Sequence, residues 1–410
     1  MLSLQTMNSS RALSALKHRN FKLFWSGQLI SLSGTWMHHA AQNWLVYTLT
    51  DSPFFLGLSG MTTTLPILLF TLAGGIFADR HHKKNIILTT QITLLILALT
   101  LAILVATNNI NVWIILIIAF FIGTANAFEI PARQSFIVEM VGKKDLLNAI
   151  ALNSSAFHAA RMTGPAIAGF LIQYLGMAAC FFINSFSFLA AIGALLKMRF
   201  KPEEIKTSPG RGVAKEFKEG MSYIVNTPEV YTLILTSGII SFFGFPYINF
   251  LPVYAKDILE TGAKGLGMLM GFAGAGAFTG AVMLAFRGDN AKKGTTMAAA
   301  GITFSIALLI FALSRNIWTS YAMLYLMGLG AISQIATANS LIQITVPDSL
   351  RGRVMSSFTT MFLGMAPLGN LALGTLAHYT NTQTALATGA GLCLSGTLLA
   401  LWKNPVLLKM

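Results

Sequence analysis

Twelve long apolar stretches, separated by polar connections, fill most of this 410-residue chain. Each holds about 20 or more predominantly apolar residues, which is the length of a helix that crosses a lipid bilayer. A helix satisfies its backbone hydrogen bonds internally, so it is the structure expected of such stretches in lipid. The sequence therefore predicts an all-α integral membrane protein with 12 transmembrane helices, arranged as two six-helix halves. The expected spans are residues 20–49, 53–78, 85–107, 111–134, 148–175, 178–199, 229–254, 265–286, 295–314, 317–343, 352–378 and 382–402.

The charged residues are few, and the basic ones gather in alternate connections. Only 10% of the residues are charged, whereas soluble domains hold about 25%. With the N-terminus placed inside, the outer connections hold only Lys256, Lys264 and Arg315 of the 28 basic residues. This positive-inside bias predicts that both termini are cytoplasmic and that the protein is a multi-pass protein of a bacterial-type inner (plasma) membrane. The net charge of +14 therefore reflects topology, and we expect a lipid bilayer, not nucleic acid, as its partner.

The longest polar break, residues 197–228, divides six spans from six. A shift of 205 residues places Gly164 on Gly369 and Gly169 on Gly374, and also Gly75 on Gly280, which indicates an internal duplication. Transporters built from repeats bind their substrate near the bilayer midplane between the halves. Within the break, residues 216–226 predict a short amphipathic helix on the inner surface. The predicted organisation is a cytoplasmic N-terminal segment (1–19), an N-terminal six-helix half (20–199), a cytoplasmic linker (200–228), a C-terminal six-helix half (229–402) and a cytoplasmic tail (403–410).

The connection between the second and third spans is short and densely polar. Gly75 is followed by Asp79 and Arg80, and then by Lys83 and Lys84. A connection this short cannot move far from the helix ends, so its charged groups stay beside them. We interpret the segment as a conformational latch on the cytoplasmic side.

Six spans plus six, together with this latch motif, resemble the major facilitator superfamily of transporters. Finer marks resemble the branch that holds enterobactin-type siderophore exporters and macrolide efflux proteins. The resemblance covers nearly the whole chain. Its branch-level motifs are Trp-Leu-Val-Tyr at 44–47, Pro-Ala-Arg-Gln at 131–134, Asn-Ala at 148–149, Asn-Ser at 153–154, Arg-x-x-Gly-Pro at 161–165 and Leu-Arg-Gly-Arg-Val at 350–354.

The resemblance implies a role for Asp79 at the end of the second span. It would hold the halves together on the inner side by contacting the N-terminal end of the eleventh span. An anion at a helix N-terminus is favoured by about 0.3–1 kcal/mol, and Arg351 and Arg353 would add positive charge nearby. We expect this latch to stabilise an outward-open state and to loosen when the protein faces inward. The alternative is that the charges serve topology alone.

Glu129 and Arg133 are spaced i,i+4 on the fourth span and therefore lie on one helical face. Ionisable groups inside a membrane are costly, and they usually face a cavity or a partner. A protonatable carboxyl within reach of an arginine suits proton coupling, because protonation weakens the pair and shifts a conformational equilibrium. A static salt bridge near the lipid headgroups is the alternative.

Arg161 is the one basic residue deep within an expected span. Gly164, Pro165 and Gly169 follow it, and proline with small neighbours permits a helix to bend and to pack closely. The resemblance to antiporters of the superfamily is weakened because Ala168 replaces a glycine of their motif. We expect this segment to serve packing and gating, and direct contact between Arg161 and an anionic substrate is the alternative.

A substrate cavity is expected between the first and seventh spans. In the first span, adjacent His38 and His39 point about 100° apart, so at most one faces the cavity squarely. A histidine there could relay protons or bind a polar group, and a packing histidine is the alternative. In the seventh span, aromatic residues around Gly244 and Pro246 suit a bulky ligand, and the alternative is that they face lipid. The cavity candidates are His38, Gln42, Asn43, Trp44, Phe245 and Tyr247.

These features favour a proton-coupled exporter of a bulky amphipathic small molecule, such as a siderophore or a drug. An importer or lipid-type flippase on the same fold is the alternative, and a non-transporting membrane receptor is a weaker one. The sequence contains no nucleotide-binding loop and no hydrolase motif, so we expect neither an enzyme nor a cofactor. No His/Cys cluster has zinc spacing. We expect protons as the coupling ion, and a monomer as the working unit.

Overall fold

The computed structural model describes residues 13–199, 213–287 and 292–409, and this part of the chain is all-helical. After a short 3₁₀ turn (Ser14–Lys17), the first half contains five long helices. These are α2 (Arg19–Thr50), α3 (Pro53–Arg80), α4 (Lys83–Ala106), α5 (Val112–Leu175) and α6 (Met177–Lys197). Their bounds lie within a few residues of the expected spans, except in α5.

The second half begins with the short surface helix α7 (Val213–Asn226), which includes the amphipathic segment expected at 216–226. The remaining helices are α8 (Pro228–Ile239), α9 (Tyr247–Val253), α10 (Gly262–Arg287), α11 (Lys293–Leu313), α12 (Ile317–Thr345), α13 (Asp348–Tyr379) and α14 (Thr382–Lys403). A 3₁₀ turn (Pro405–Lys409) ends the described chain. The first part of the predicted linker, residues 200–212, lies outside the described residues.

Ten of the described helical segments are long and apolar enough to cross a membrane by length and composition. The number twelve therefore stays a prediction. One of the ten is the 64-residue α5, which covers both the fourth and the fifth expected span. The first span is present as α2, which is not among the ten.

The extent of the loop expected between the fourth and fifth spans, residues 135–147, is wrong, because these residues are helical on both sides of the single non-helical residue Gly142. Phe136, Ile137 and Met140, which the expected loop includes, are buried in the hydrophobic core of the first half. The two spans are separated only by a break at Gly142, whose φ of 66° and ψ of 177° are not helical.

The seventh expected span is interrupted rather than continuous. Helix α8 passes into a π-helical segment (Ile240–Gly244), and α9 starts just after Pro246. A second π-helical segment (Tyr254–Ile258) extends the span beyond its expected end at residue 254. Proline lacks an amide hydrogen to donate, so the regular hydrogen-bond ladder is broken at this point, midway along the span.

Two of the glycine pairs related by 205 residues make equivalent contacts. A Cβ on Gly164 would lie 2.7 Å from the Ser33 carbonyl oxygen in α2, and one on Gly369 would meet the Phe242 carbonyl oxygen in the seventh span. The second pair, Gly169 and Gly374, makes contacts between the two halves. Gly169 in α5 meets Gly267 in α10, and Gly374 in α13 meets Gly57 in α3.

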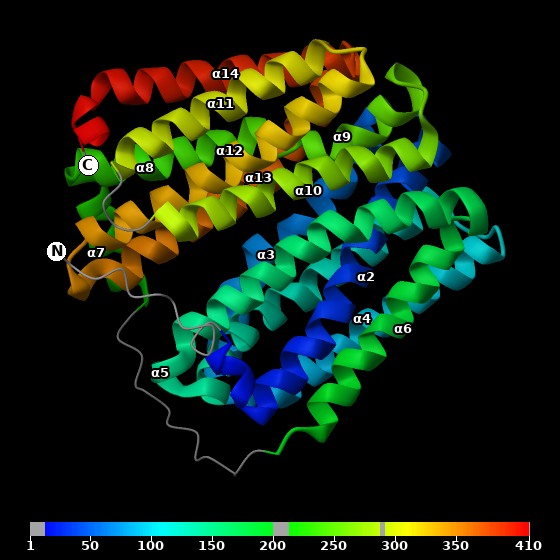
Figure 1. The fold of residues 1–410 in the computed structure, drawn as a ribbon, viewed down its shortest axis with the longest axis horizontal. Coiled ribbons are helices and arrows are strands. Elements are labelled where there is room, and N and C mark those ends of the chain that lie inside the picture. The colour runs from blue at the N-terminus through cyan, green and yellow to red at the C-terminus, as the bar shows by residue number, and fades with distance from the viewer. Residues whose placement is uncertain (1–12, 200–212, 288–291, 410) are drawn as a thin grey trace.

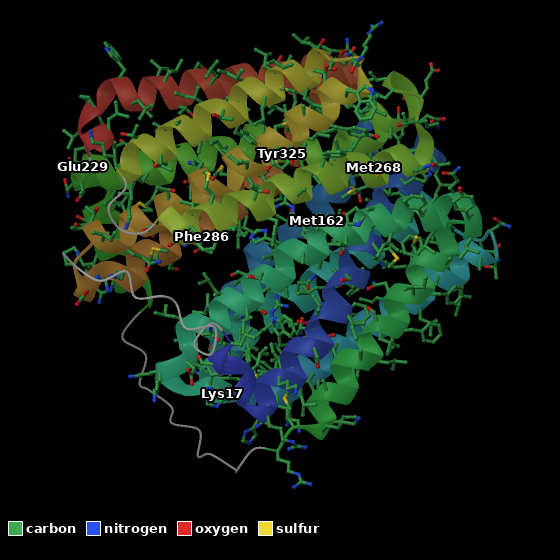
Figure 2. The ribbon with its side chains drawn as sticks, in the orientation of Figure 1. Lys17, Met162, Glu229, Met268, Phe286 and Tyr325 are labelled. Atoms are coloured by element: carbon green, nitrogen blue, oxygen red, sulfur yellow. The ribbon has the colours of Figure 1, made fainter. Side chains whose placement is uncertain are left out.

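The two halves meet along only part of their length. Figure 1 shows α5 and α10 close together at the end that carries α9 and far apart at the end that carries α7. In Figure 2, Met162 lies on α5 where it runs beside α10, whereas Lys17 and Phe286 lie where the halves diverge. The halves therefore close at the α9 end and separate at the α7 end, and the predicted topology assigns the separated end to the cytoplasmic side.

Candidate functional site

A cavity of about 200 Å³, lined by both apolar and polar side chains, lies inside the first half between α2, α3, α4, α5 and α6. Two aromatic side chains, Trp36 and Phe157, form part of its wall, with their ring centroids 5.5 Å apart. Such a cavity within a membrane half provides a place for groups that lipid would not tolerate. Its polar lining includes Gln28, His38, His39, Gln91, Glu129 and Arg133.

Glu129 is the central group of this cavity and is only 3% exposed. The Gln91 side-chain amide donates to both carboxylate oxygens at 3.0 Å, and the Thr90 hydroxyl donates to one at 3.2 Å. Arg133 approaches the carboxylate at 3.5 Å from the next turn of α5. Glu129 is the one buried acidic side chain in the part of the chain that the structure describes.

The Glu129 cluster extends to α2. Arg133 donates a long hydrogen bond of 3.4 Å to the Gln28 side-chain oxygen, and the Ser31 hydroxyl lies 3.5 Å from the Gln91 side-chain oxygen. Three helices, α2, α4 and α5, are therefore connected through one carboxyl group. A change in its charge acts on all three.

Of the residues predicted for a substrate cavity, only His38 lines the one in the first half, and His39 lines it as well. His38 is 3% exposed, and its Nε2 lies 3.2 Å from the Gln42 side-chain oxygen. Gln42 in turn donates to the Ser59 hydroxyl of α3 at 3.2 Å. His38 and Gln42 thus tie α2 to α3, and His38 also faces the cavity.

Asn43 and Trp44 lie toward the closed junction of the halves. The Asn43 amide donates to Asn249 at 3.2 Å, and Asn249 donates to Asn370 of α13 at 2.9 Å. Trp44 is half-buried and packs against the hydrophobic core. This asparagine chain crosses from one half to the other.

Two charged contacts close the same end of the molecule. The Tyr47 hydroxyl donates to Asp257, and Lys256 pairs with Asp51. No local pattern pairs these residues, because they belong to different halves. The available signal for these contacts was that both pairs lie at the ends of the first and seventh spans.

Phe245 and Tyr247 lie in the second half, separate from the cavity that contains His38. Phe245 is partly buried, and its ring lies 5.5 Å from that of Phe362. Tyr247 is only 1% exposed and begins α9. That all six predicted residues share one substrate cavity stays a prediction.

The latch residues of the first half lie at the open end. Asp79 and Arg80 are exposed, and within the described chain Asp79 forms no ion pair. Gly75 has open space around it. The predicted contact between Asp79 and the eleventh span is therefore absent in this arrangement of the halves.

The lysines of the latch contact their own half. Lys83 pairs with Glu139 at 2.6 Å, and Lys84 donates to the Met198 carbonyl oxygen at 3.1 Å. In the second half, Arg351 pairs with Asp348, and Arg353 pairs with Glu219 of α7. The second-half arginines thus hold α7 and the start of α13, not α3.

The predicted bend and packing residues of α5 lie at the junction between the halves. Gly164 and Pro165 are buried, and the Pro165 carbonyl oxygen would lie 2.6 Å from a Cβ on Gly267. Gly169 meets the same turn of α10. Small residues on both helices permit this backbone contact.

The sequence matches a family described as transmembrane secretion effector over residues 10–407. This family is part of the major facilitator superfamily. The chain belongs to it. As a member of this family, the protein is a multi-pass membrane transporter, and its relatives are transporters rather than enzymes.

Two characterised members of the superfamily resemble the chain over most of its length. The staphyloferrin A transporter of Staphylococcus aureus is 26% identical over 87% of this chain and 89% of its own. The enterobactin exporter EntS of Shigella boydii is 24% identical over 95% of this chain and 93% of its own.

A solved structure supports the fold. The inward-facing, unoccupied form of a bacterial homologue of the human lysosomal transporter Spinster aligns with a TM-score of 0.68. It covers 97% of this chain at 14% sequence identity, so the likeness extends to the fold alone. Within the described residues, no group of three or more side chains is arranged to hold a metal ion.

Proposed function

We propose that this transporter exports a bulky amphipathic small molecule, such as a siderophore or a drug-like compound, in exchange for protons. The observation that carries the proposal is the buried carboxyl of Glu129 in the cavity of the first half. An ionisable group at this depth in a membrane helix is retained for a functional reason more often than for stability. The names of the relatives, a siderophore transporter and an exporter, support the substrate class and the direction.

Protonation of Glu129 would change the forces between three helices. The ionised carboxylate accepts from Gln91 and Thr90 and attracts Arg133. A neutral carboxyl loses most of the attraction to Arg133 and turns one acceptor into a donor. A proton therefore binds the two conformations with different affinity, and this difference is what shifts the equilibrium between them.

The latch would act at the other end of the same cycle. When the halves close at the cytoplasmic end, Asp79 would approach the N-terminal end of α13, which begins at Asp348 and carries Arg351. In the present arrangement Asp79 is exposed and Arg351 pairs with Asp348. The latch would therefore form in the outward-open state, with both termini in the cytoplasm and one chain as the working unit.

Substrate accumulation in an efflux-deficient bacterial host tests the proposal. A radiolabelled catecholate siderophore and a radiolabelled macrolide serve as probes, each with and without a protonophore. We expect the wild type to lower the accumulation of at least one probe, and Glu129→Gln and the protonophore each to abolish this effect. Glu229→Gln is the matched control, because Glu229 lies in the first turn of α8, away from the cavity (Figure 2).

Two results would contradict the proposal. Higher accumulation in cells that hold the wild type would indicate import. Export that survives both Glu129→Gln and the protonophore would remove proton coupling through this carboxyl.

A further inference from the structure

Arg161 carries a buried charge that the mechanism above does not use. It is 8% exposed, and its guanidinium lies 5.5 Å from the centroid of the Trp36 ring. Among the described residues no carboxylate lies within ion-pair distance of it. Removing a guanidinium from water without an anion is unfavourable, so this position calls for an anionic partner, which the described residues do not supply.

Tyr247, in the other half of the molecule, carries a buried hydroxyl that faces the same position. Its side chain is 1% exposed, and its hydroxyl has no hydrogen-bond partner in the described structure. The Arg161 guanidinium lies beside this hydroxyl and can donate a hydrogen bond to it, so the two groups face each other. The break in the seventh span at Pro246 is what places Tyr247 here, at the first residue of α9.

These two groups lie where the halves meet. A Cβ on Gly274 of α10 would lie 2.8 Å from the Arg161 carbonyl oxygen and 2.6 Å from the Met162 Cα, so the α5 and α10 backbones are in contact at this turn. Figure 2 places Met162 on α5 beside α10. The repeat architecture predicts a substrate site at this junction.

The cavity of the first half leads toward Arg161. Phe157 lines that cavity and lies one helical turn before Arg161, on the same face of α5. Trp36 lines it as well and lies under the guanidinium. A molecule that entered the cavity would therefore meet two aromatic faces and, at their edge, a positive charge.

We propose that Arg161 and Tyr247 bind an acidic group of the transported molecule, while Trp36 and Phe157 cover its apolar part. The proposal rests on the proposed function, because it specifies the substrate class of that transporter as acidic amphipathic compounds. A carboxylate matches the planar fork of arginine and can accept from both guanidinium and phenol. A halide would satisfy the charge but would leave the aromatic faces without a ligand.

Binding to the full-length protein in lipid nanodiscs tests this without any proton gradient. The probes are three aromatic carboxylates and their uncharged amides: 1-naphthoate and 1-naphthamide, indole-3-acetate and indole-3-acetamide, and 4-phenylbutyrate and 4-phenylbutyramide. Equilibrium dialysis gives a dissociation constant for each. We expect at least one carboxylate to bind about tenfold more tightly than its amide, which is the scale of one charge-assisted hydrogen bond.

The variants separate a binding role from a packing role. Arg161→Gln should abolish the preference for the acid, Arg161→Lys should keep part of it, and Tyr247→Phe should reduce it by about threefold. Arg315→Gln, which removes an exposed cation from an outer connection, should leave it unchanged. If Arg161→Gln fails to fold, Arg161→Lys and Tyr247→Phe carry the test.

Three results would overturn the proposal. These are equal binding of every acid and its amide to the wild type, a preference that survives Arg161→Gln, or displacement of the acids by equimolar chloride. Repeating the assay with Glu129→Gln distinguishes this proposal from proton coupling. An acid preference that persists in Glu129→Gln supports the Arg161 site even where the export assay fails. Equal binding of acids and amides to the wild type removes the site even where the export assay succeeds.

Discussion

Replacing Gly267 by alanine should separate the two halves at the junction of α5 and α10. A Cβ on Gly267 would lie 2.6 Å from the Pro165 carbonyl oxygen and 3.0 Å from the Gly169 Cα. Both are backbone atoms, which cannot move aside as the end of a flexible side chain can. Overpacking of this kind costs about 1–3 kcal/mol.

The same substitution improves helix propensity by about 0.8–1.0 kcal/mol. That gain applies to α10 in every conformation, so it cancels from the equilibrium between conformations. The steric clash exists only where the helices touch. The population with a closed junction should therefore fall about 5-fold to 150-fold relative to the population with an open one.

Pulsed electron paramagnetic resonance can measure this shift. Spin labels at Asn109→Cys and Thr380→Cys report the distance between the outer connections of the two halves. The native thiols of Cys180 and Cys393 are free and buried, and both are replaced by alanine in the parent protein. We expect Gly267→Ala to add a population at longer distance.

Gly193→Ala in α6 is the matched control, because a Cβ there meets no atom within 4 Å. It makes the same chemical change in another helix. Identical distance distributions in the Gly267 and Gly193 variants would refute the reasoning, since the close approach would then not determine closure.

Three further predictions concern the two ends of the molecule and the break in α5. At the closed end, Tyr47→Phe should raise the population in which this end is open more than Asp51→Asn does. A hydrogen bond to a charged acceptor, such as that from Tyr47 to Asp257, contributes about 1.5–3 kcal/mol, whereas an exposed ion pair, such as that of Asp51 with Lys256, contributes about 0–1 kcal/mol. The same spin labels measure both variants. At the other end, Asp79→Asn should lower the outward-open population and the export rate, and unchanged accessibility of cytoplasmic cysteine reporters would contradict the latch. Gly142→Ala should lower the thermal unfolding temperature, because alanine at a φ of 66° and ψ of 177° is strained by about 1–3 kcal/mol, and an unchanged temperature would show that the break relaxes without loss.

The sequence predicts the local features of this fold well. The second span was expected at 53–78 and is Pro53–Arg80, because proline at its start and charges at its end mark a helix clearly. The i,i+4 spacing of Glu129 and Arg133 placed them on one face, and they lie 3.5 Å apart. Such features depend only on the geometry of one helix.

Contacts between helices were beyond this reasoning. Nothing in the local pattern indicates that Gln91 on α4 binds Glu129 on α5, because that depends on which faces of the two helices pack together. The loop expected before Asp145 was wrong for a related reason. The apolar residues there, such as Phe136, pack in the hydrophobic core of the first half, and this packing depends on neighbouring helices.

The glycine contact between α5 and α10 also limits what can control the transporter. Backbone atoms of Gly169 and Gly267 meet there without side chains between them, so the contact contains no titratable group. Its strength comes from dispersion forces, which depend little on acidity or ionic strength. This contact between the halves is therefore insensitive to the chemical environment on either side of the membrane. Any response of the proposed cycle to acidity has to originate away from this contact, in groups such as the carboxyl of Glu129.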